Sequence, residues 1–431
     1  MKIDVAPPRG TRDLLPGEVE RRDAATTVIL DTYRAYGFHR IETPALESLP
    51  LLTSGEGGEN EKLIFKILKR GEKLDASLRG DVRELADLGL RFDLTVPLAR
   101  YYAHNHARLP TPFKAIQIGP VWRAERPQRG RYRQFTQCDI DVLGLRSEVV
   151  EIELILATCD ALVGLGVTNP VVRLNNRRLL AALAQHCGVE ERQRERFFIA
   201  FDKLDKMGAA GVLDELRATG HTRETLERFE TLLAELGHEG WGLDAFRARI
   251  LPGQEDDAMH DAMAGLQTIM DAVARAAESR YAIRFDPTLV RGMGYYTGPI
   301  FEVSRAGAAS SLAGGGRYDR MIGKLLGREV PACGFSIGLD RLVDALEQTT
   351  PAGPEPGVRR IALLFDAEAD GVGDIVTQAR SLRRQGAVVS IETKSRNMGR
   401  RLAELETQGF THYGLAGAAA LKPLHRPRVE R

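Results

Sequence analysis

The order of strand-like and helical segments along the chain restricts its fold more than any other feature of the sequence. Residues 179–279 are rich in Arg and Glu and poor in strand-forming residues, so we expect an almost wholly helical segment there. Strand-like stretches precede this segment, and strand character returns after it, at residues 282–303 and 330–337. A sheet whose strands are interrupted by a helical insertion is typical of an α+β fold rather than of alternating βαβ units.

The other elements expected in this part of the chain follow from hydrophobic periodicity and from glycine and proline signals. Helices are expected at residues 18–36, where Gly37 provides a stop, and at 148–164. Strands are expected at 38–47, 90–98, 113–125 and 133–144. We interpret the Gly- and Glu-rich residues 51–61 as a loop and the polar residues 75–89 as an inserted hairpin or loop.

A Pro- and Gly-rich stretch at residues 349–358 predicts a linker between two domains. Beyond it, the pattern predicts a small βαβαβ unit, with strands at 361–365, 387–392 and 411–417 and helices at 374–385 and 397–408. After Gly417 we expect no further strand or helix, so this α/β domain, residues 359–431, is expected to be a shortened one.

Composition and charge exclude several classes of protein. The chain has 431 residues, 43% hydrophobic and 28% charged, and a formal net charge of +1. This charge gives no global basic field, so a nucleic-acid partner would have to be held by local patches. The four cysteines form no CxxC pair, which argues against a zinc site or a disulfide framework and favours a reducing cytoplasm. No apolar run reaches membrane-spanning length, and residues 1–13 have no apolar segment of the kind found in signal peptides.

Two strands that flank residues 125–133 bring chemically useful side chains to one face. Side chains alternate along a strand, so Arg123 and Glu125 share a face of the first strand. If the strands pair as an antiparallel hairpin, these two can line one pocket with four residues of the second strand: Phe135, Gln137, Asp139 and Asp141. Ile140 and Val142 then lie on the opposite face, as core residues should. The alternative interpretation is a hairpin whose polar face is only solvated.

Two further arginines lie in segments that suit phosphate binding. Arg341 follows an apolar strand that turns at Gly338 into a helix, which we expect Asp340 to cap; the guanidinium would then lie near the positive end of that helix. Arg291 lies in residues 289–298, where two glycines and two tyrosines indicate close backbone approach. A fixed guanidinium fork binds phosphate oxygens at two points, which suggests that these arginines act together with Arg123.

Each of these segments also has a simpler explanation. Arg341 fits an ordinary strand–helix junction, and residues 289–298 fit a β-bulge with packed tyrosines. The Gly-rich run at 313–319 is either a phosphate nest or a flexible turn.

Taken together, these segments resemble the class II aminoacyl-tRNA synthetases, and among them the histidyl-tRNA synthetase family. The hairpin at 113–144 is similar to motif 2 of the class, and GFSIGLDR (334–341) is similar to motif 3. LVRGMGYY (289–296) and AGGGRYD (313–319) resemble the two stretches peculiar to the histidyl family, and residues 7–16 with the following helix and strand resemble its opening and motif 1. The likeness covers nearly the whole chain. It implies a catalytic domain at 1–348, built on an antiparallel sheet with a helical insertion, and an anticodon-binding-like domain at 359–431.

The resemblance implies ATP, histidine and tRNA(His) as substrates, with Mg²⁺ accompanying ATP through ligands that the sequence does not identify. Arg123 would bind the α-phosphate, Arg291 would be a second cation there, and Arg341 would bind the γ-phosphate. Glu125 would face the adenine amino group, and Phe135 would stack on the adenine ring.

For the amino acid, the resemblance implies two groups of contacts. The histidine ammonium would be bound by Asp93, Thr95 and Gln137. The imidazole would be hydrogen-bonded by Asp141 and Tyr296, and Tyr295 and Arg291 complete the histidine-binding set.

The loop between the hairpin strands carries basic side chains suited to the phosphates of a tRNA acceptor end: Arg126, Arg129, Arg131 and Arg133. The alternative is a solvated charged turn. Gly294 departs from the family pattern, in which many members carry an acid before the tyrosine pair.

The favoured function is therefore a cytoplasmic histidine–tRNA ligase, with a homodimer implied by the family likeness alone. One alternative is a non-catalytic paralogue that acts as a regulatory subunit of ATP phosphoribosyltransferase. Such proteins typically lack the anticodon domain and lose catalytic residues, whereas Arg123, Arg291 and Arg341 are all present here. A third hypothesis is a ligase that adenylates histidine for an acceptor other than tRNA, which the short C-terminal domain would allow.

Overall fold

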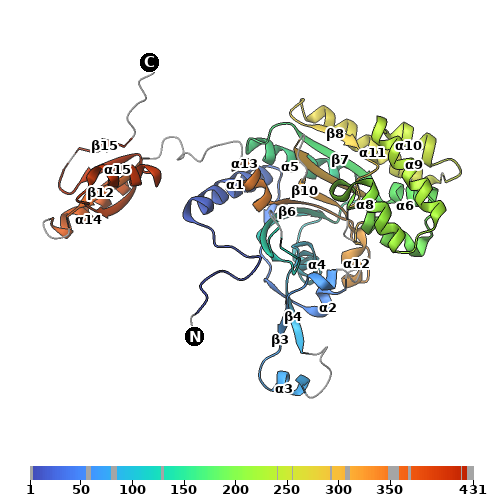
Figure 1. Ribbon diagram of the computed structural model, residues 1–431, viewed down its shortest axis with the longest axis horizontal. Helices are drawn as coiled ribbons and strands as arrows, with labels where there is room; N and C mark the ends of the chain where they lie inside the picture. Colours follow the sequence, from blue (N-terminus) through green and yellow to red (C-terminus); the bar gives the residue numbers. More distant parts are fainter. Residues whose placement is uncertain are drawn as a thin grey trace. The chain divides into compact units, whose positions relative to one another are not determined.

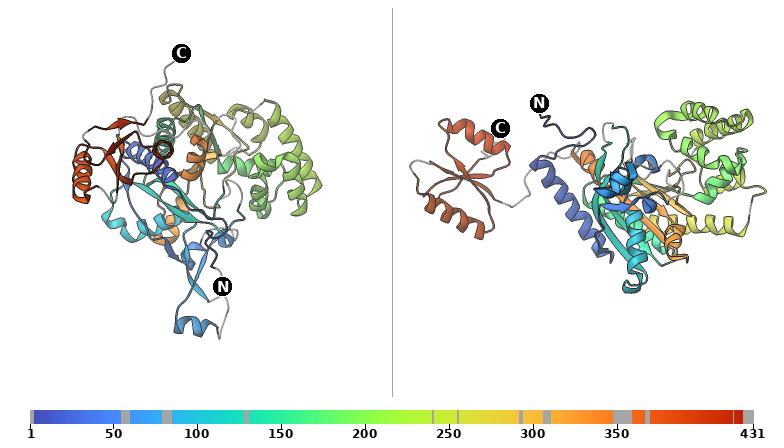
Figure 2. Two further views of the ribbon diagram at one scale, coloured as in Figure 1. Left: turned by 60° about the vertical axis from the view of Figure 1, so that its left-hand side comes forward. Right: turned by 90° about the horizontal axis from the view of Figure 1, so that it is seen from below.

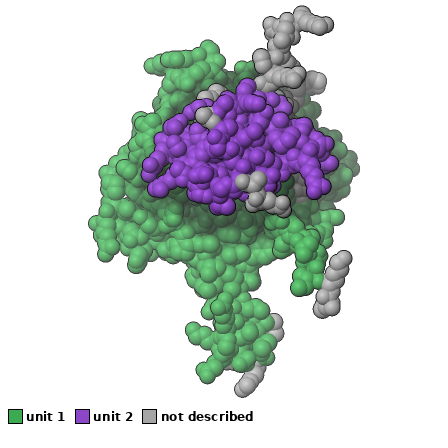
Figure 3. Space-filling view, turned by 90° about the vertical axis from the view of Figure 1, so that its left-hand side faces the viewer, with its two compact units in different colours: residues 1–348 green, residues 349–431 purple. Residues whose placement is uncertain are grey.

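The computed structural model divides the chain into two compact units, Met1–Gln348 and Thr349–Arg431, which are coloured separately in Figure 3. It describes residues 3–54, 60–78, 85–127, 131–239, 241–254, 256–291, 294–305, 311–347, 359–366, 370–418 and 420–424. The predicted linker at 349–358 lies outside these residues, as do the central part of the predicted loop at 51–61 and the tail from residue 425.

The first unit is organised around an eight-stranded sheet with the order β1-β5-β6-β11-β10-β9-β7-β8 (Figure 1). Its strands, in that order, are His39–Arg40, Phe113–Trp122, Gln134–Leu143, Ala332–Gly338, Ser311–Arg317, Pro299–Arg305, Pro170–Asn176 and Ala282–Phe285. Pairing is antiparallel from β5 to β7, whereas the edge strands β1 and β8 pair in parallel with their neighbours. The predicted α+β class is confirmed.

The two faces of β5 and β6 differ as side-chain alternation requires. Ile116 and Ile140 pair across the hairpin and are fully buried against α1 (Pro16–Ala35) and α5 (Val149–Gly164). On the opposite face, Phe113 and Leu143 pack with residues of α4 (Thr95–Asn105) and α12 (Asp319–Leu326). This second face continues past those helices into the candidate site.

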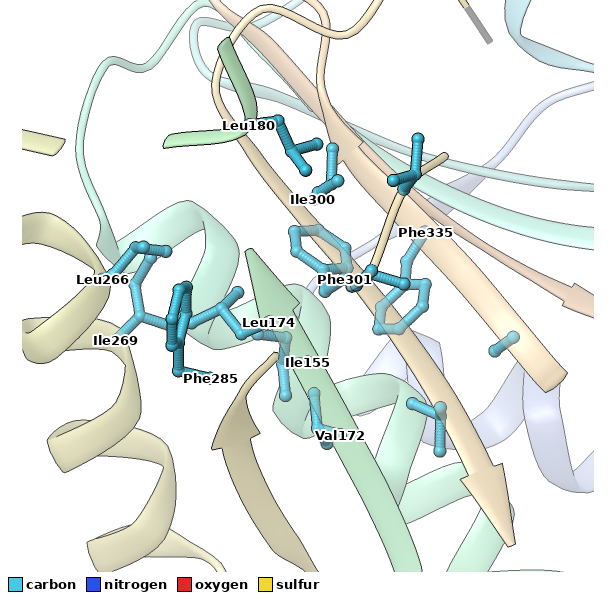
Figure 4. Packing of buried hydrophobic residues seen from close by; sticks show 14 of the residues in the cluster. Ile155, Val172, Leu174, Leu180, Leu266, Ile269, Phe285, Ile300, Phe301 and Phe335 are labelled. Atoms are coloured by element: carbon cyan, nitrogen blue, oxygen red, sulfur yellow. The ribbon is translucent and has the colours of Figure 1, made fainter. Parts of the chain in front are cut away.

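The main core lies between the sheet and the helices that cover it. Phe301 of β9 and Phe335 of β11 have ring centroids 4.6 Å apart and lie close to Ile155 of α5 in Figure 4. Leu266 and Ile269 of α11 (Asp257–Ala276) extend the same cluster towards β7 and β8.

The helical insertion runs from α6 to α11, between β7 and β8 in the chain. Its helices gather beyond this edge of the sheet (Figures 1 and 2). They are α6 (Arg177–His186), α7 (Arg194–Phe201), α8 (Leu204–Ala218), α9 (Arg223–Glu239), α10 (Leu243–Ile250) and α11. Phe197 packs edge-on against Phe229 with centroids 4.9 Å apart, so the insertion brings apolar packing of its own to the shared core.

Two local predictions for this unit were wrong. Residues 90–98 are not one strand: β4 (Ala86–Leu90) ends there and α4 begins at Thr95, because Asp93 accepts the backbone N–H of Val96 at 3.0 Å. The Gly-rich run at 313–319 is neither a nest nor a turn but the end of strand β10 and the start of α12. The strand character expected at 282–303 is found in β8 and β9, which are separated by the segment that carries Arg291.

A small three-stranded sheet, β2-β4-β3, projects from the main sheet together with α3 (Figure 1). Its other elements are β2 (Leu46–Ser48), α2 (Leu49–Leu52), β3 (Lys66–Leu68) and α3 (Glu72–Leu78). The expected inserted hairpin at 75–89 thus corresponds to α3 and β4, with residues 79–84 outside the described part of the chain.

The second unit has the predicted βαβαβ order and one further strand. Its sheet has the order β13-β12-β14-β15, and the first three strands are parallel. The elements are β12 (Arg360–Phe365), α14 (Val372–Arg384), β13 (Val388–Thr393), α15 (Met398–Thr407), β14 (His412–Leu415) and β15 (Lys422–Pro423). The expectation of no strand after Gly417 was wrong, since β15 pairs antiparallel with β14. No helix among the described residues of either unit is long and apolar enough to cross a membrane.

Candidate active site

A cavity of about 260 Å³ lies on the sheet face that carries the polar residues of β6. All six residues expected to share a pocket line it: Arg123, Glu125, Phe135, Gln137, Asp139 and Asp141. It is also lined by seven other residues predicted from the sequence: Asp93, Thr95, Arg131, Arg291, Tyr295, Tyr296 and Arg341. The structure therefore brings together side chains that are far apart in the sequence.

The neighbouring strands explain why one face collects these groups. Gln137, Asp139 and Asp141 pair across β6 and β11 with Gly338, Ser336 and Gly334, and paired residues share a face. Position 334 requires glycine because the Asp141 carboxylate lies against its backbone, and a Cβ there would lie 1.9 Å from Oδ1 of Asp141. The floor of the cavity is thus largely backbone, and the acids of β6 form one of its walls.

Several buried acceptors line the cavity. Asp141 accepts a hydrogen bond from the phenol of Tyr318 at 2.5 Å, and the side-chain amide of Gln137 donates to Oγ of Ser336 at 2.7 Å. Among the described residues, Oδ2 of Asp93, Oδ2 of Asp141 and Oε1 of Gln137 have no hydrogen-bond partner. Buried acceptors are costly unless paired, so the cavity is suited to a ligand that donates hydrogen bonds.

Burial determines the protonation of these acids. It raises the pKa of Asp93 to about 6 and that of Asp141 to about 7. Burial, followed by the neighbouring charge of Asp141, raises the pKa of Asp139 well above its ordinary value. A cation bound among them would favour the ionised forms, so these acids and a cationic ligand group stabilise each other.

Several guanidinium groups also line the cavity. Nε of Arg123 donates to the carbonyl of Phe92 at 3.0 Å, and its guanidinium lies over the ring of Phe135, 5.1 Å from the centroid. Arg131 pairs with Glu125 at 3.4 Å. These contacts hold two cations at the mouth of the hairpin.

Arg291 is held by its partner and by a glycine. Its Nη1 donates to Oε2 of Glu302 at 2.7 Å. A Cβ on Gly314 would lie 2.4 Å from the guanidinium carbon and from both terminal nitrogens, so the group lies directly against the backbone of β10. The Gly-rich run therefore leaves room for Arg291.

Arg341 lies in the first turn of α13 (Leu339–Glu347). Burial, and then the positive charges of Arg131, Arg123 and Arg291, lower the pKa of its guanidinium, which places these cations within electrostatic range of one another. The prediction that Asp340 caps α13 was wrong. The helix begins at Leu339, and the Asp340 carboxylate accepts the backbone N–H of Thr136 at 2.8 Å and pairs with Arg22 at 2.7 Å.

The tyrosines form an aromatic wall. The rings of Tyr295 and Tyr296 are edge-on with centroids 4.9 Å apart, and the Tyr295 and Tyr318 centroids are 6.1 Å apart. Burial raises the pKa of Tyr296 to about 12, so its phenol keeps its proton. Tyr318 was not assigned a role from the sequence, although it belongs to the segment AGGGRYD. If that segment is interpreted as a strand, side-chain alternation places Tyr318 on the face of the sheet that carries Asp141.

The predicted basic loop is only partly at the cavity. Arg126 is exposed and does not line the cavity, and Arg129 lies outside the described residues. The backbone N–H of Arg133 donates to the carbonyl of Gly10 at 2.7 Å, which links the loop to the N-terminal segment. Among the described residues, no group of three or more His, Cys, Asp or Glu side chains is arranged to hold a metal.

The cavity thus combines buried acids with several guanidinium groups. Such a lining suits a ligand pair in which one partner carries a donor group and the other carries phosphates. Glu125 and Phe135 line the same cavity.

Comparisons with known proteins agree with this geometry. A family model described as histidyl-tRNA synthetase matches residues 10–342. The curated histidine–tRNA ligase of Leifsonia xyli subsp. xyli is 46% identical over 98% of this chain and 99% of its own length. A probable histidine–tRNA ligase of Tropheryma whipplei is 38% identical and covers 95% of each chain.

Solved structures show the same architecture. The crystal structure of histidyl-tRNA synthetase from Nostoc sp. PCC 7120 has a TM-score of 0.76 at 27% identity, covering 98% of this chain and 95% of that one. A Bacillus halodurans protein described as an ATP phosphoribosyltransferase regulatory subunit/histidyl-tRNA synthetase has a TM-score of 0.73 at 21% identity, covering 97% of this chain and 100% of that one. At that identity it shares the fold alone.

Proposed function

Because the chain belongs to the histidyl-tRNA synthetase family, we propose that its cavity forms histidyl-adenylate from histidine and ATP and then transfers the histidyl group to tRNA(His). The single observation that carries this proposal is the presence of buried acceptors and several guanidinium groups in one cavity. The first step joins an amino acid that carries an ammonium group to a polyphosphate, and the cavity offers complementary groups for both.

Arg123 and Arg291 bind the α-phosphate. The histidine carboxylate attacks the α-phosphorus, a carboxylate–phosphate bond forms, and pyrophosphate leaves with the electrons of the broken bond. Negative charge builds on the non-bridging oxygens, and the two preorganised guanidinium groups stabilise it without a protein nucleophile. Arg341 binds the γ-phosphate, Phe135 stacks on adenine, and Glu125 accepts from its amino group.

Asp93, Thr95 and Gln137 bind the histidine ammonium. Asp141 and Tyr296, beside Tyr295, bind the imidazole. Support comes from the unpartnered oxygens, which belong to Asp93, Gln137 and Asp141. An amino acid without two ring nitrogens would leave the polar groups of Asp141 and Tyr296 unpaired, which is the stronger kind of discrimination.

Mg²⁺ accompanies ATP in this proposal as a counter-ion of the phosphates. The described residues offer no cage of three or more acidic or thiol ligands, which fits a cation held mainly by phosphate oxygens and water. The ion would neutralise charge on the leaving pyrophosphate.

For the second step, Arg126 and Arg131, together with Arg129, would bind phosphates of the tRNA acceptor end. We assign catalysis to residues 1–348 and anticodon binding to residues 359–431, joined by a linker at 349–358. We further propose that the enzyme works in the cytoplasm as a homodimer. The regulatory-subunit alternative is disfavoured, because Arg123, Arg291 and Arg341 all line the cavity.

Two assays test the function in sequence. Histidine-dependent ATP–pyrophosphate exchange tests adenylate formation, and charging of total tRNA with labelled histidine tests transfer. We expect both activities. Absence of exchange would refute the proposal in favour of a regulatory protein, and exchange without charging would point to another acceptor.

A further inference from the structure

A row of paired residues crosses the sheet from the cavity to its far edge. Asp139 pairs with Ser336, which pairs with Gly314 of β10. Gly314 pairs with Glu302 of β9, and Glu302 pairs with Arg173 of β7. Residues paired in this way share one face, so the row continues the cavity floor beneath Arg291 towards the helical insertion.

Charged contacts join two residues of this row, Glu302 and Arg173, to each other and to groups on either side. Glu302 binds Arg291 through Oε2 at 2.7 Å and Arg173 through Oε1 at 3.4 Å. Nη1 of Arg173 also binds Oδ2 of Asp205 at 2.6 Å. Asp205 lies in the first turn of α8, so the series begins in the insertion and ends at the guanidinium proposed to act on the α-phosphate.

The surroundings hold Arg173 in one orientation. Its Nε donates to Oδ2 of Asp286 at 2.7 Å, and Asp286 is itself fixed by the hydroxyl and backbone N–H of Thr288, at 2.6 and 2.9 Å. The side chains of Arg173 and Glu302 are 12% and 14% exposed, so their interaction is weakly screened, whereas Asp205 is 61% exposed. Asp202, at the end of α7, adds a second negative charge within electrostatic range of Arg291.

We propose that Asp205, Arg173 and Glu302 are positioning residues through which the helical insertion fixes Arg291 for adenylate formation. Nη1 of Arg173 is shared between Asp205 and Glu302. Without the Asp205 carboxylate, Nη1 of Arg173 is left to Glu302 alone, and its stronger attraction draws that carboxylate away from Arg291. This inference rests on the proposed function, because it takes the Arg291 guanidinium as the group that acts on the α-phosphate.

The test is Asp205→Asn in the full-length protein, which removes one exposed charge and keeps the size of the side chain. We expect the kcat of histidine-dependent exchange to fall about 5-fold, with unchanged KM for histidine and an unchanged melting temperature. Asp205→Glu should restore most of the rate. The matched control is Glu227→Gln, which breaks an ion pair with Arg223 on α9 of the same insertion. The Glu227 side chain is 59% exposed, similar to Asp205, and this substitution should leave kcat unchanged.

The decisive measurement repeats Asp205→Asn in an Arg291→Ala background. If Asp205 acts through Arg291, the second substitution costs nothing further, because coupled residues are non-additive. An equal fold-loss in both backgrounds, or an equal loss in Glu227→Gln, would overturn the inference while leaving the proposed function intact. A wild-type protein without exchange activity would overturn both.

Discussion

The phenol of Tyr318 donates a 2.5 Å hydrogen bond to Oδ1 of Asp141, and the other oxygen of that carboxylate has no partner among the described residues. The two residues come from different thirds of the chain, since Asp141 lies on β6 and Tyr318 immediately precedes α12. The contact fixes which oxygen of Asp141 remains for a ligand. It also favours the ionised carboxylate and thus counteracts part of the effect of burial on its pKa.

Tyr318→Phe should therefore weaken histidine binding. Loss of a hydrogen bond to a charged group costs about 1.5–3 kcal/mol, so we expect the KM for histidine to rise by roughly one to two decades. Steady-state exchange kinetics measure this, with the KM for ATP as the internal control. Equal increases in both constants would show that the change disturbs the whole cavity instead.

The raised pKa of Asp141 predicts a stability effect with a defined sign. Its pKa is about 7 in the folded protein against an ordinary value of 3.8, so the folded state holds the proton more tightly. The stabilising contribution of this group is complete below about pH 4 and is lost as the pH rises to about 7. Asp141→Asn has no such group, so the stability of the wild type relative to this variant should decline across that window. Melting temperatures of both proteins from pH 4 to pH 8 provide the check, and a difference that stays constant or grows with pH would contradict it.

Arg291→Ala should slow adenylate formation with little change in the fold. Removal of one preorganised donor to a developing oxyanion typically costs about 3–4 kcal/mol, or about two to three decades in rate. Exchange kinetics measure the loss, and circular dichroism monitors the fold. A near-normal exchange rate would remove Arg291 from the catalytic set.

Gly314→Ala should mimic part of that loss without altering a charge. The added methyl group would lie 2.4 Å from the Arg291 guanidinium, so the guanidinium must move. We expect a lower kcat for exchange, by about one decade, since a misplacement of about 1 Å can cost 10²-fold. Gly373→Ala in α14, where a Cβ meets nothing within 4 Å, is the matched control and should have normal activity.

Arg126→Ala should separate the two steps of the reaction. Arg126 is exposed and does not line the cavity, so exchange should be unaffected. The KM for tRNA should rise, and the slope of its salt dependence should fall by about one unit, as expected for one lost phosphate contact. Charging assays at several salt concentrations test this, and an unchanged slope would exclude Arg126 from the tRNA contacts.

Much of the site could be predicted from the sequence because it depends on side-chain alternation. A hairpin over residues 113–144 places Arg123, Gln137 and Asp141 on a shared face through strand geometry alone. The convergence of Arg291 and Arg341 on the same cavity was expected from the family resemblance and the phosphate chemistry.

The remaining features depend on tertiary contacts that local patterns do not reveal. The Gly-rich run suggested a turn because glycine is rare in strands, yet Gly314 and Gly315 lie in β10 where neighbouring groups leave no room for a Cβ. Residues 90–98 alternate like a strand, but Asp93 starts a helix that buries Leu98 and Tyr102. The contacts of Glu302 with Arg291 and Arg173 depend on the register of three strands, β7, β9 and β10, which no single segment specifies.

The glycine floor of the cavity has a consequence for any attempt to redesign the enzyme. Side chains can adopt new rotamers to admit a bulkier substrate, but Gly314, Gly315 and Gly334 have no side chain that could move. The position of these peptide units is fixed by the hydrogen bonding of the sheet, so substitutions cannot deepen the cavity in small steps. Enlarging the range of accepted amino acids would have to begin at the tyrosine wall, while the base of the cavity stays as it is.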